Sequence, residues 1–167
     1  MEIPPRAARR LLEPNEERRQ IIHRRLRDIP FGLPITALDS TDPKVVAAKN
    51  AMRELNNEIR TLMAPEVRNS NRWVFAAKLC ARKRPRLFPV RDNKVCEDLS
   101  ASGKLRRGFG MSLFDNDLQL FGYLMSLESI KAELAGLRES LEGEGLRLDD
   151  TDLRLLDVVL WTAAQGT

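Results

Sequence analysis

Apolar residues recur at helical spacing along most of the chain. After Pro43 they follow alternating steps of three and four residues, at Val45, Ala48, Met52, Leu55, Ile59 and Leu62. Asp42 is a favoured N-cap residue and proline suits the first helical position, so a helix begins here. Similar patterns predict helices over residues 5–12, 16–27, 73–82, 92–99, 116–126, 127–142 and 152–164. No comparable strand pattern exists. We therefore expect a compact all-α domain over residues 1–167, with two lobes meeting near residues 64–100 as an open alternative.

Prolines and glycines interrupt this helical pattern at definite places. They predict loops over residues 29–41 and 64–70, and a glycine-containing basic loop over residues 100–110. Pro85 and Pro89 exclude a regular helix between Arg82 and Arg91. We expect that segment to be extended and to display its charges at the surface.

The segment 152–164 is apolar on almost every side. A helix of this kind is usually buried, so we expect it at the centre of the fold. Trp161 is then predicted to be a core residue rather than a stacking platform.

The composition limits the chemistry that the chain can perform. Two cysteines, Cys80 and Cys96, and one histidine, His23, do not make a disulfide framework or a usual zinc site, so no metal or other cofactor is expected. His23 is surrounded by arginines, which indicates a solvated helix face. No apolar run is long enough to span a bilayer and the first ten residues lack a signal peptide, so we expect a cytoplasmic protein that does not bind membranes.

Charge is distributed unevenly along the chain. Residues 68–107 contain twelve Lys or Arg and three acidic residues, a net charge of +9, whereas residues 108–167 contain four basic and eleven acidic residues, a net charge of −7. The basic stretch indicates a polyanionic partner, and DNA bound through its phosphates is the interpretation we favour. The alternative is that the acidic helices cover and neutralise the basic ones. The candidate DNA-binding residues are Arg72, Arg82, Lys83, Arg84, Arg86, Arg91, Lys104, Arg106 and Arg107.

The order helix, basic turn, Pro89-Val90-Arg91-Asp92 and helix resembles the C-terminal half of the helix-hairpin-helix DNA glycosylase signature. In that superfamily a Gly-Val-Gly hairpin and a helix precede a Pro-Val-Asp step that bears the catalytic aspartate. Residues 3–12, 73–95 and 153–161 are more closely similar to a bacterial family of compact glycosylase relatives that carries Lys-Arg-Pro-Arg-Leu and Pro-Val-x-Asp. That likeness spans most of the chain but implies no established activity. Those relatives have further N-terminal helices, so a shortened start is an open expectation.

The resemblance implies that Asp92 is the catalytic residue of a DNA-repair hydrolase. The position of the Schiff-base lysine of bifunctional members falls near Val74, so the implied glycosylase is monofunctional. Ser70, Asn71 and Arg72 stand where the superfamily has Gly-Val-Gly. Glycines there permit close approach to a phosphate and positive φ angles, so hairpin-type phosphate binding is not expected here. The charged side chain of Arg72 is a candidate to bind a phosphate in place of the glycine hairpin. Asn71 is a candidate for a left-handed backbone angle or for the cap of the next helix.

Hydrolysis of an N-glycosidic bond builds positive charge on the deoxyribose, and one carboxylate is sufficient to stabilise it once the base has been flipped out. Asp92 is therefore a catalytic candidate, but the residues themselves favour an N-cap of the helix that follows or a partner of Arg91 or Arg86. Two other functions stay open: a DNA-binding module without catalysis, and an interaction or oligomerisation module built on the acidic helices of residues 128–144. The aromatic candidates for a base pocket or wedge are Phe75, Phe88, Phe109, Phe114 and Tyr123.

Overall fold

The computed structural model describes residues 9, 12–13, 17–63, 69–101, 113–146 and 151–166. Every regular element within these ranges is a helix, which confirms the all-α prediction for this part of the chain. The elements are α2 (Glu17–Asp28), the 3-10 helix η1 (Ile35–Ala37), α3 (Pro43–Met63), α4 (Asn69–Lys83), α5 (Asn93–Ala101), α6 (Leu113–Ser126), α7 (Glu128–Gly143) and α8 (Asp152–Gln165). Of the helix predicted over residues 5–12, only residues 9 and 12 are described.

Local capping chemistry explains where several helices begin. The Asp42 carboxylate accepts a hydrogen bond from the backbone N–H of Lys44 at 2.8 Å, and α3 starts at Pro43 as predicted. Thr151 caps α8 by accepting a hydrogen bond from the Arg154 N–H at 3.4 Å. Each cap satisfies a backbone donor of the first helical turn that has no partner inside the helix.

Helix α4 begins at Asn69, four residues before the predicted start at Trp73. Ser70, Asn71 and Arg72 therefore have helical backbone, and the expectation that Asn71 forms a left-handed turn is wrong. No non-glycine residue of the described ranges has a positive φ angle. Because these positions lack glycine, α4 extends toward the N-terminus without the helix penalty that glycine carries.

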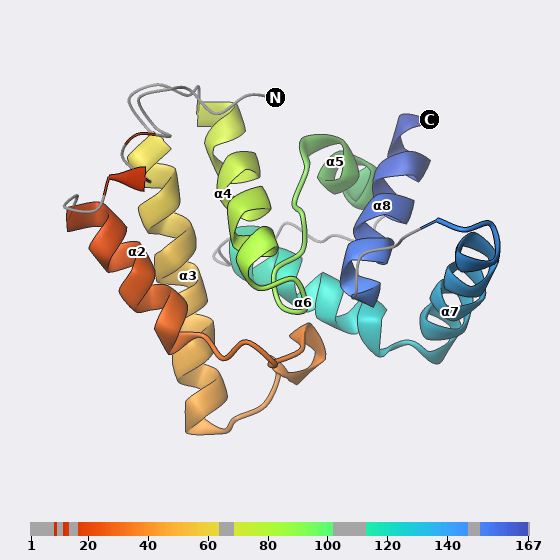
Figure 1. Cartoon of the computed structure of the whole chain (residues 1–167), viewed down its shortest axis with the longest axis horizontal. Helices are drawn as coiled ribbons and strands as arrows, with labels where there is room; N and C mark the ends of the chain where they lie inside the picture. Colours follow the sequence, from red (N-terminus) through yellow and green to blue (C-terminus); the bar gives the residue numbers. More distant parts are fainter. Residues whose placement is uncertain are drawn as a thin grey trace.

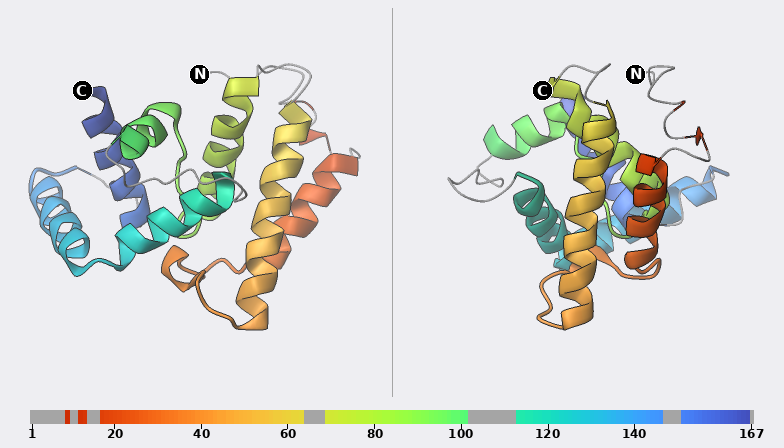
Figure 2. Two further views of the ribbon diagram at one scale, coloured as in Figure 1. Left: turned by 180° about the vertical axis from the view of Figure 1, so that it is seen from behind. Right: turned by 90° about the vertical axis from the view of Figure 1, so that its left-hand side faces the viewer.

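The helices form two groups joined through the middle of the molecule. Helix α2 packs on α3 and α3 on α4, while α5 packs on α8 and α7 contacts both α6 and α8. Figure 1 shows α2, α3 and α4 side by side, with α5, α8 and α7 beyond them. Helix α6 packs on η1 and crosses from one group to the other, as the left view of Figure 2 shows.

The connecting segment (residues 84–92) runs from the end of α4 to the start of α5 and enters the core. Leu87, Phe88 and Pro89 are fully buried. The N–H groups of Leu87 and Phe88 both donate to the Arg84 carbonyl, at 3.0 and 3.1 Å, so the segment starts with a tight turn. Pro85 and Pro89 do end the helix, but the expectation that this segment displays its charges at the surface holds only in part: Arg86 is exposed, whereas Arg91 is buried. Its apolar side chains fill the space between the two helix groups.

Helix α8 lies between α5 and α7 but buries only one of its faces, so the prediction that it is the central buried helix is wrong. Leu153, Leu155 and Leu156 face the core, whereas Val158 and Trp161 are exposed. Trp161 is 49% exposed and is not a core residue. Among the described helices none is both long and apolar enough to cross a bilayer.

Candidate functional site

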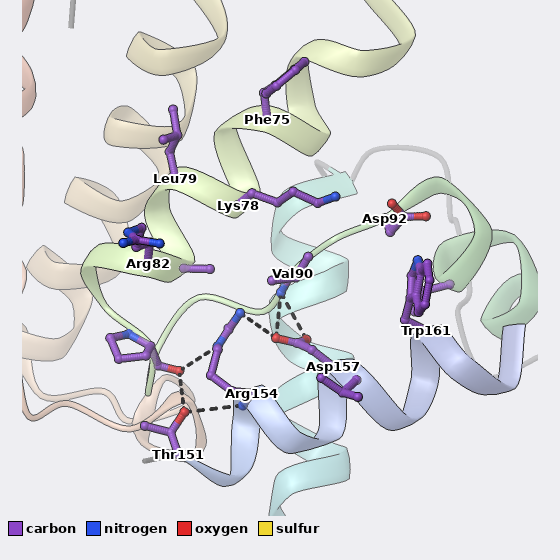
Figure 3. Close-up of a pocket in the computed structure, with 14 residues that line it drawn as sticks. Phe75, Lys78, Leu79, Arg82, Val90, Asp92, Thr151, Arg154, Asp157 and Trp161 are labelled. Atoms are coloured by element: carbon purple, nitrogen blue, oxygen red, sulfur yellow. Dashed lines mark hydrogen bonds and ion pairs between the residues drawn. The ribbon is translucent and has the colours of Figure 1, made fainter. Parts of the chain in front are cut away.

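An open cleft of about 1020 Å³ lies between α4, the connecting segment, the start of α5 and α8. Figure 3 labels side chains of α4, of the connecting segment and of α8 around it. Its lining combines carboxylates, cations and apolar rings, and consists of Phe75, Lys78, Leu79, Ala81, Arg82, Pro85, Val90, Asp92, Val95, Thr151, Arg154, Asp157, Val158 and Trp161. The volume is at the top of the roughly 300–1,000 Å³ that is usual for the pockets of small-molecule ligands.

Asp92 is both a helix cap and a wall of this cleft. Its Oδ1 accepts a hydrogen bond from the Lys94 N–H at 3.0 Å, and its carbonyl accepts one from the Cys96 N–H at 3.0 Å. The predicted cap is therefore present. The predicted ion pair with Arg91 or Arg86 is not formed, and within the described residues Oδ2 accepts no hydrogen bond. One carboxylate oxygen thus stays available to a ligand in the cleft.

A second carboxylate, Asp157 of α8, was not found from the sequence. It is buried, and its two oxygens lie 3.0 and 3.1 Å from the backbone nitrogen of Val90, two residues before Asp92. Arg154 lies 2.7 Å from Asp157 through its Nη1 and also donates to the carbonyls of Pro85 and Phe88. Figure 3 shows these bonds joining α8 to the connecting segment. A lone aspartate in the apolar run of α8, three residues after an arginine, was the available signal.

Burial raises the pKa of Asp157 to about 7, against the lowering effects of Arg154 and the Val90 N–H. Because the folded protein holds this proton more tightly than the unfolded chain, in which the ordinary value is 3.8, its stabilising contribution is largest at low pH. The free energy of unfolding should therefore fall as pH rises from about 4 to about 7 and level off above.

We expect the Val90 amide to report this titration directly. Its nuclear magnetic resonance shift should change with a midpoint near pH 7 because the Asp157 carboxyl is its hydrogen-bond acceptor. In Asp157→Asn, the change in the Val90 shift near pH 7 should disappear. The fall in the free energy of unfolding between about pH 4 and pH 7 should disappear with it. A Val90 shift that moves identically in the variant would assign the titration to another group.

The basic residues predicted to bind DNA separate into outward and inward sets. Arg82 lines the cleft and is exposed, as are Lys83 and Arg86, whereas Arg72 is half-buried. Lys78, which the prediction omitted, is exposed and extends over the cleft in Figure 3. Lys104, Arg106 and Arg107 lie outside the described residues.

Arg84 and Arg91 do not belong to an outward-facing phosphate-binding surface, which corrects their assignment. The Arg84 guanidinium donates to the carbonyls of Leu26 and Ile29 in the segment that ends α2. Arg91 is 4% exposed and pairs with the buried Asp117 of α6. Both side chains leave an irregular segment, where no helical periodicity indicates which face is buried.

The acidic helices do not neutralise the outward cations within the described ranges. Two carboxylates of α6 pair with distant cations, Asp117 with the buried Arg91 and Asp115 with Arg53, whereas the cations of α7 pair within α7 or with α8: Lys131 with Glu128 at 2.8 Å, and Arg138 with Asp152 at 3.0 Å. Arg82, Lys83 and Arg86 form no ion pair with another described residue. The alternative that acidic helices cover the basic residues therefore applies to Arg91 but not to Arg82, Lys83 and Arg86.

The aromatic wall of the cleft differs from the predicted set. Phe75 lines it, and the exposed Trp161 lies at the end near Asp92 in Figure 3. Phe88 and Phe114 are buried, Tyr123 is exposed but does not line the cleft, and Phe109 lies outside the described residues. Trp161 was missed because its helix is apolar on almost every side.

The remaining side chains add no nucleophile or metal centre within the described residues. Burial raises the pKa of the Cys80 thiol, which keeps it protonated and unreactive. His23 is exposed on α2, away from the cleft lining. No group of three or more His, Cys, Asp and Glu side chains in this part of the chain is placed to hold a metal ion.

The model of a family described as "Family of unknown function (DUF6308)" matches residues 1–164. No curated protein and no solved structure matches the chain.

Proposed function

The chain belongs to the family of unknown function DUF6308, and from its cleft we propose that it binds DNA and hydrolyses an N-glycosidic bond as a monofunctional base-excision glycosylase. The observation that carries the proposal is the arrangement of Asp92, Trp161 and Arg82 around this cleft. A carboxylate oxygen, an aromatic face and an exposed cation are the groups that a flipped nucleotide requires.

Each part of the nucleotide has a counterpart in the cleft. Lys78 and Arg82 of α4 suit the phosphates of the DNA strand. Trp161 and Phe75 supply apolar and aromatic surface for the flipped base, since base–aromatic stacking tolerates any base. Asp92 then faces the sugar. The resemblance of Pro89-Val90-Arg91-Asp92 to the glycosylase signature supports the same assignment.

In the reaction the C1′–N bond breaks and its electron pair leaves with the base. The positive charge that develops on the sugar is stabilised by the Asp92 carboxylate. The oxygen of a water molecule forms the new C1′–O bond, its proton passes to the carboxylate, and the released base takes up a proton from solvent. Asp157 does not touch the sugar in this scheme. It holds the Val90 N–H and so fixes the backbone that presents Asp92.

Binding of a blunt DNA duplex, measured by fluorescence anisotropy at several salt concentrations, tests the first half of the proposal. We expect Arg82→Ala to weaken binding and to lower the slope of log affinity against log salt by about 1, because one phosphate contact is lost. The matched control is Lys131→Ala on α7, which removes a cation that pairs with Glu128 outside the cleft. Equal effects of the two substitutions would contradict a phosphate-binding role of the cleft.

Heat-alkali cleavage of duplexes that carry single damaged bases tests the second half. Release of a base leaves an abasic site, which breaks under alkali. Binding without breaks on any damaged base would reduce the protein to a DNA-binding module. The helical backbone of Ser70–Arg72, where glycosylases have a glycine hairpin, is the observation that favours this second candidate.

A further inference from the structure

An exposed aromatic ring lies beside the basic turn, outside the cleft. Phe31, in the loop after α2, is 69% exposed, and the Arg84 guanidinium carbon lies 5.5 Å from its ring centroid. Figure 1 shows this loop passing near the C-terminal end of α4, where Arg84 follows. A single exposed apolar side chain is common on protein surfaces, so only its neighbours can indicate whether Phe31 has a partner.

Arg84 keeps the ring in a fixed environment. Its Nε donates to the Ile29 carbonyl at 3.0 Å, its Nη1 to the Lys83 carbonyl at 2.8 Å and its Nη2 to the Leu26 carbonyl. Burial lowers the pKa of Arg84, but an arginine stays charged in a protein. The guanidinium thus covers one face of Phe31 by a cation–π contact, and the exposed fraction shows that much of the remaining ring surface is open.

Three further cations adjoin these contacts along the chain. Arg27, Lys83 and Arg86 are exposed, and none forms an ion pair with another described residue. Arg27 follows Leu26 and Lys83 precedes Arg84, the two residues that the Arg84 Nη2 bond joins. The Arg86 carbonyl accepts the N–H of Ile35, four residues after Phe31, at 3.0 Å. The nearby Asp28 lies 3.8 Å from Arg25 on its own helix. Arg82 precedes Lys83 on α4 and lines the cleft, so it links these cations with the cleft.

We propose that Phe31 is a stacking platform for an unpaired nucleobase, with Arg27, Lys83 and Arg86 binding the adjacent phosphates. The proposal rests on the proposed DNA binding and defines its substrate as DNA that contains an unpaired stretch. Inside a duplex both faces of a base are covered by neighbouring bases, so only an unstacked base can lie on the open face of Phe31. The combination of an aromatic face with a row of cations is how proteins bind single strands without a base preference.

The test compares a single-stranded oligonucleotide with the blunt duplex of the same sequence, using the full chain. We expect Phe31→Ala to weaken single-strand binding about tenfold, the size of one base–aromatic stacking contact, and to change duplex binding little. Phe31→Trp should retain single-strand binding. The control is Tyr123→Ala on α6, an aromatic side chain of similar exposure, 60%, without a cation over its ring among the contacts described. It should change neither affinity.

The outcomes separate this proposal from the proposed function. If Arg82→Ala weakens duplex binding while Phe31→Ala and Tyr123→Ala leave single-strand binding equal to that of the wild type, only the platform is wrong. If the wild type binds neither form of DNA, both proposals fail. The last measurement is binding to vesicles that contain phosphatidylserine, because an aromatic ring among cations also suits an anionic membrane. Loss of vesicle binding in Phe31→Ala with unchanged oligonucleotide binding would overturn the proposal.

Discussion

Asp92→Asn is expected to abolish strand breaks at damaged bases while DNA binding stays near the wild-type level. The substitution removes the negative charge that faces the sugar, and loss of such a group typically lowers the rate by about 10²–10⁴-fold. It does not remove the helix cap, because asparagine caps a helix about as well as aspartate and its side-chain oxygen can still accept from the Lys94 N–H. Heat-alkali cleavage and fluorescence anisotropy on the same substrates measure the two properties.

Two further variants separate catalysis from capping. Asp92→Ala loses both functions, so it should be inactive and also less stable by about 0.5–2 kcal/mol. Asp42→Asn alters an equivalent N-cap, on α3, whose Oδ1 accepts the Lys44 N–H outside the cleft, and it should leave activity unchanged. Undiminished strand breaks in Asp92→Asn would show that the carboxylate has only its structural role.

Sequence reasoning worked where one local signal decides the structure. Asp42 followed by Pro43 located the start of α3, and the spacing of three and four residues carried the helix to its observed end near Leu62. Proline likewise located the break between α4 and α5. These signals depend on backbone sterics and on capping within a few residues, so they are readable without knowledge of distant neighbours.

The orientation of the arginines was not readable in this way. Arg82 to Arg91 form one basic run in the sequence, but the fold turns Arg84 toward α2 and Arg91 toward α6 and leaves Arg82 in the cleft. The partners of the two inward residues lie in segments far away along the chain, at Ile29 and Asp117. Because the run is not helical from Arg84 onward, no periodicity separates an inward from an outward side chain.

The sequence identified only part of the candidate site, because it does not show which side chains are covered by distant segments. Asp92 stood out because it follows a proline step and opens a helix. Asp157 and Trp161 lie on α8, whose apolar composition predicts burial on all sides. The composition of a helix does not tell whether a neighbour covers each face, and here one face of α8 borders the cleft.

Asp117→Ala is expected to lower the free energy of unfolding by about 3–5 kcal/mol, a large part of the roughly 5–15 kcal/mol typical of a domain. The guanidinium of Arg91 lies 5.0 Å from the Trp73 ring centroid and 5.3 Å from that of Phe114 and is closed off from water. Removing Asp117 leaves this charge buried without its carboxylate. Urea denaturation followed by the helical circular dichroism signal measures the change.

The neighbouring pair of Arg53 and Asp115 provides the control for Asp117→Ala. Asp115 is also on α6, but this pair is partly exposed, with its closest atoms 2.9 Å apart. Arg53→Ala should therefore cost about 1 kcal/mol or less, because water solvates the remaining carboxylate. A double variant, Arg91→Met with Asp117→Leu, should recover most of the stability, since replacing both charges removes the desolvation penalty. Equal losses in Asp117→Ala and Arg53→Ala would contradict burial as the cause. In that case Arg91 would have access to water, and its exclusion from the DNA-binding surface would have to be withdrawn.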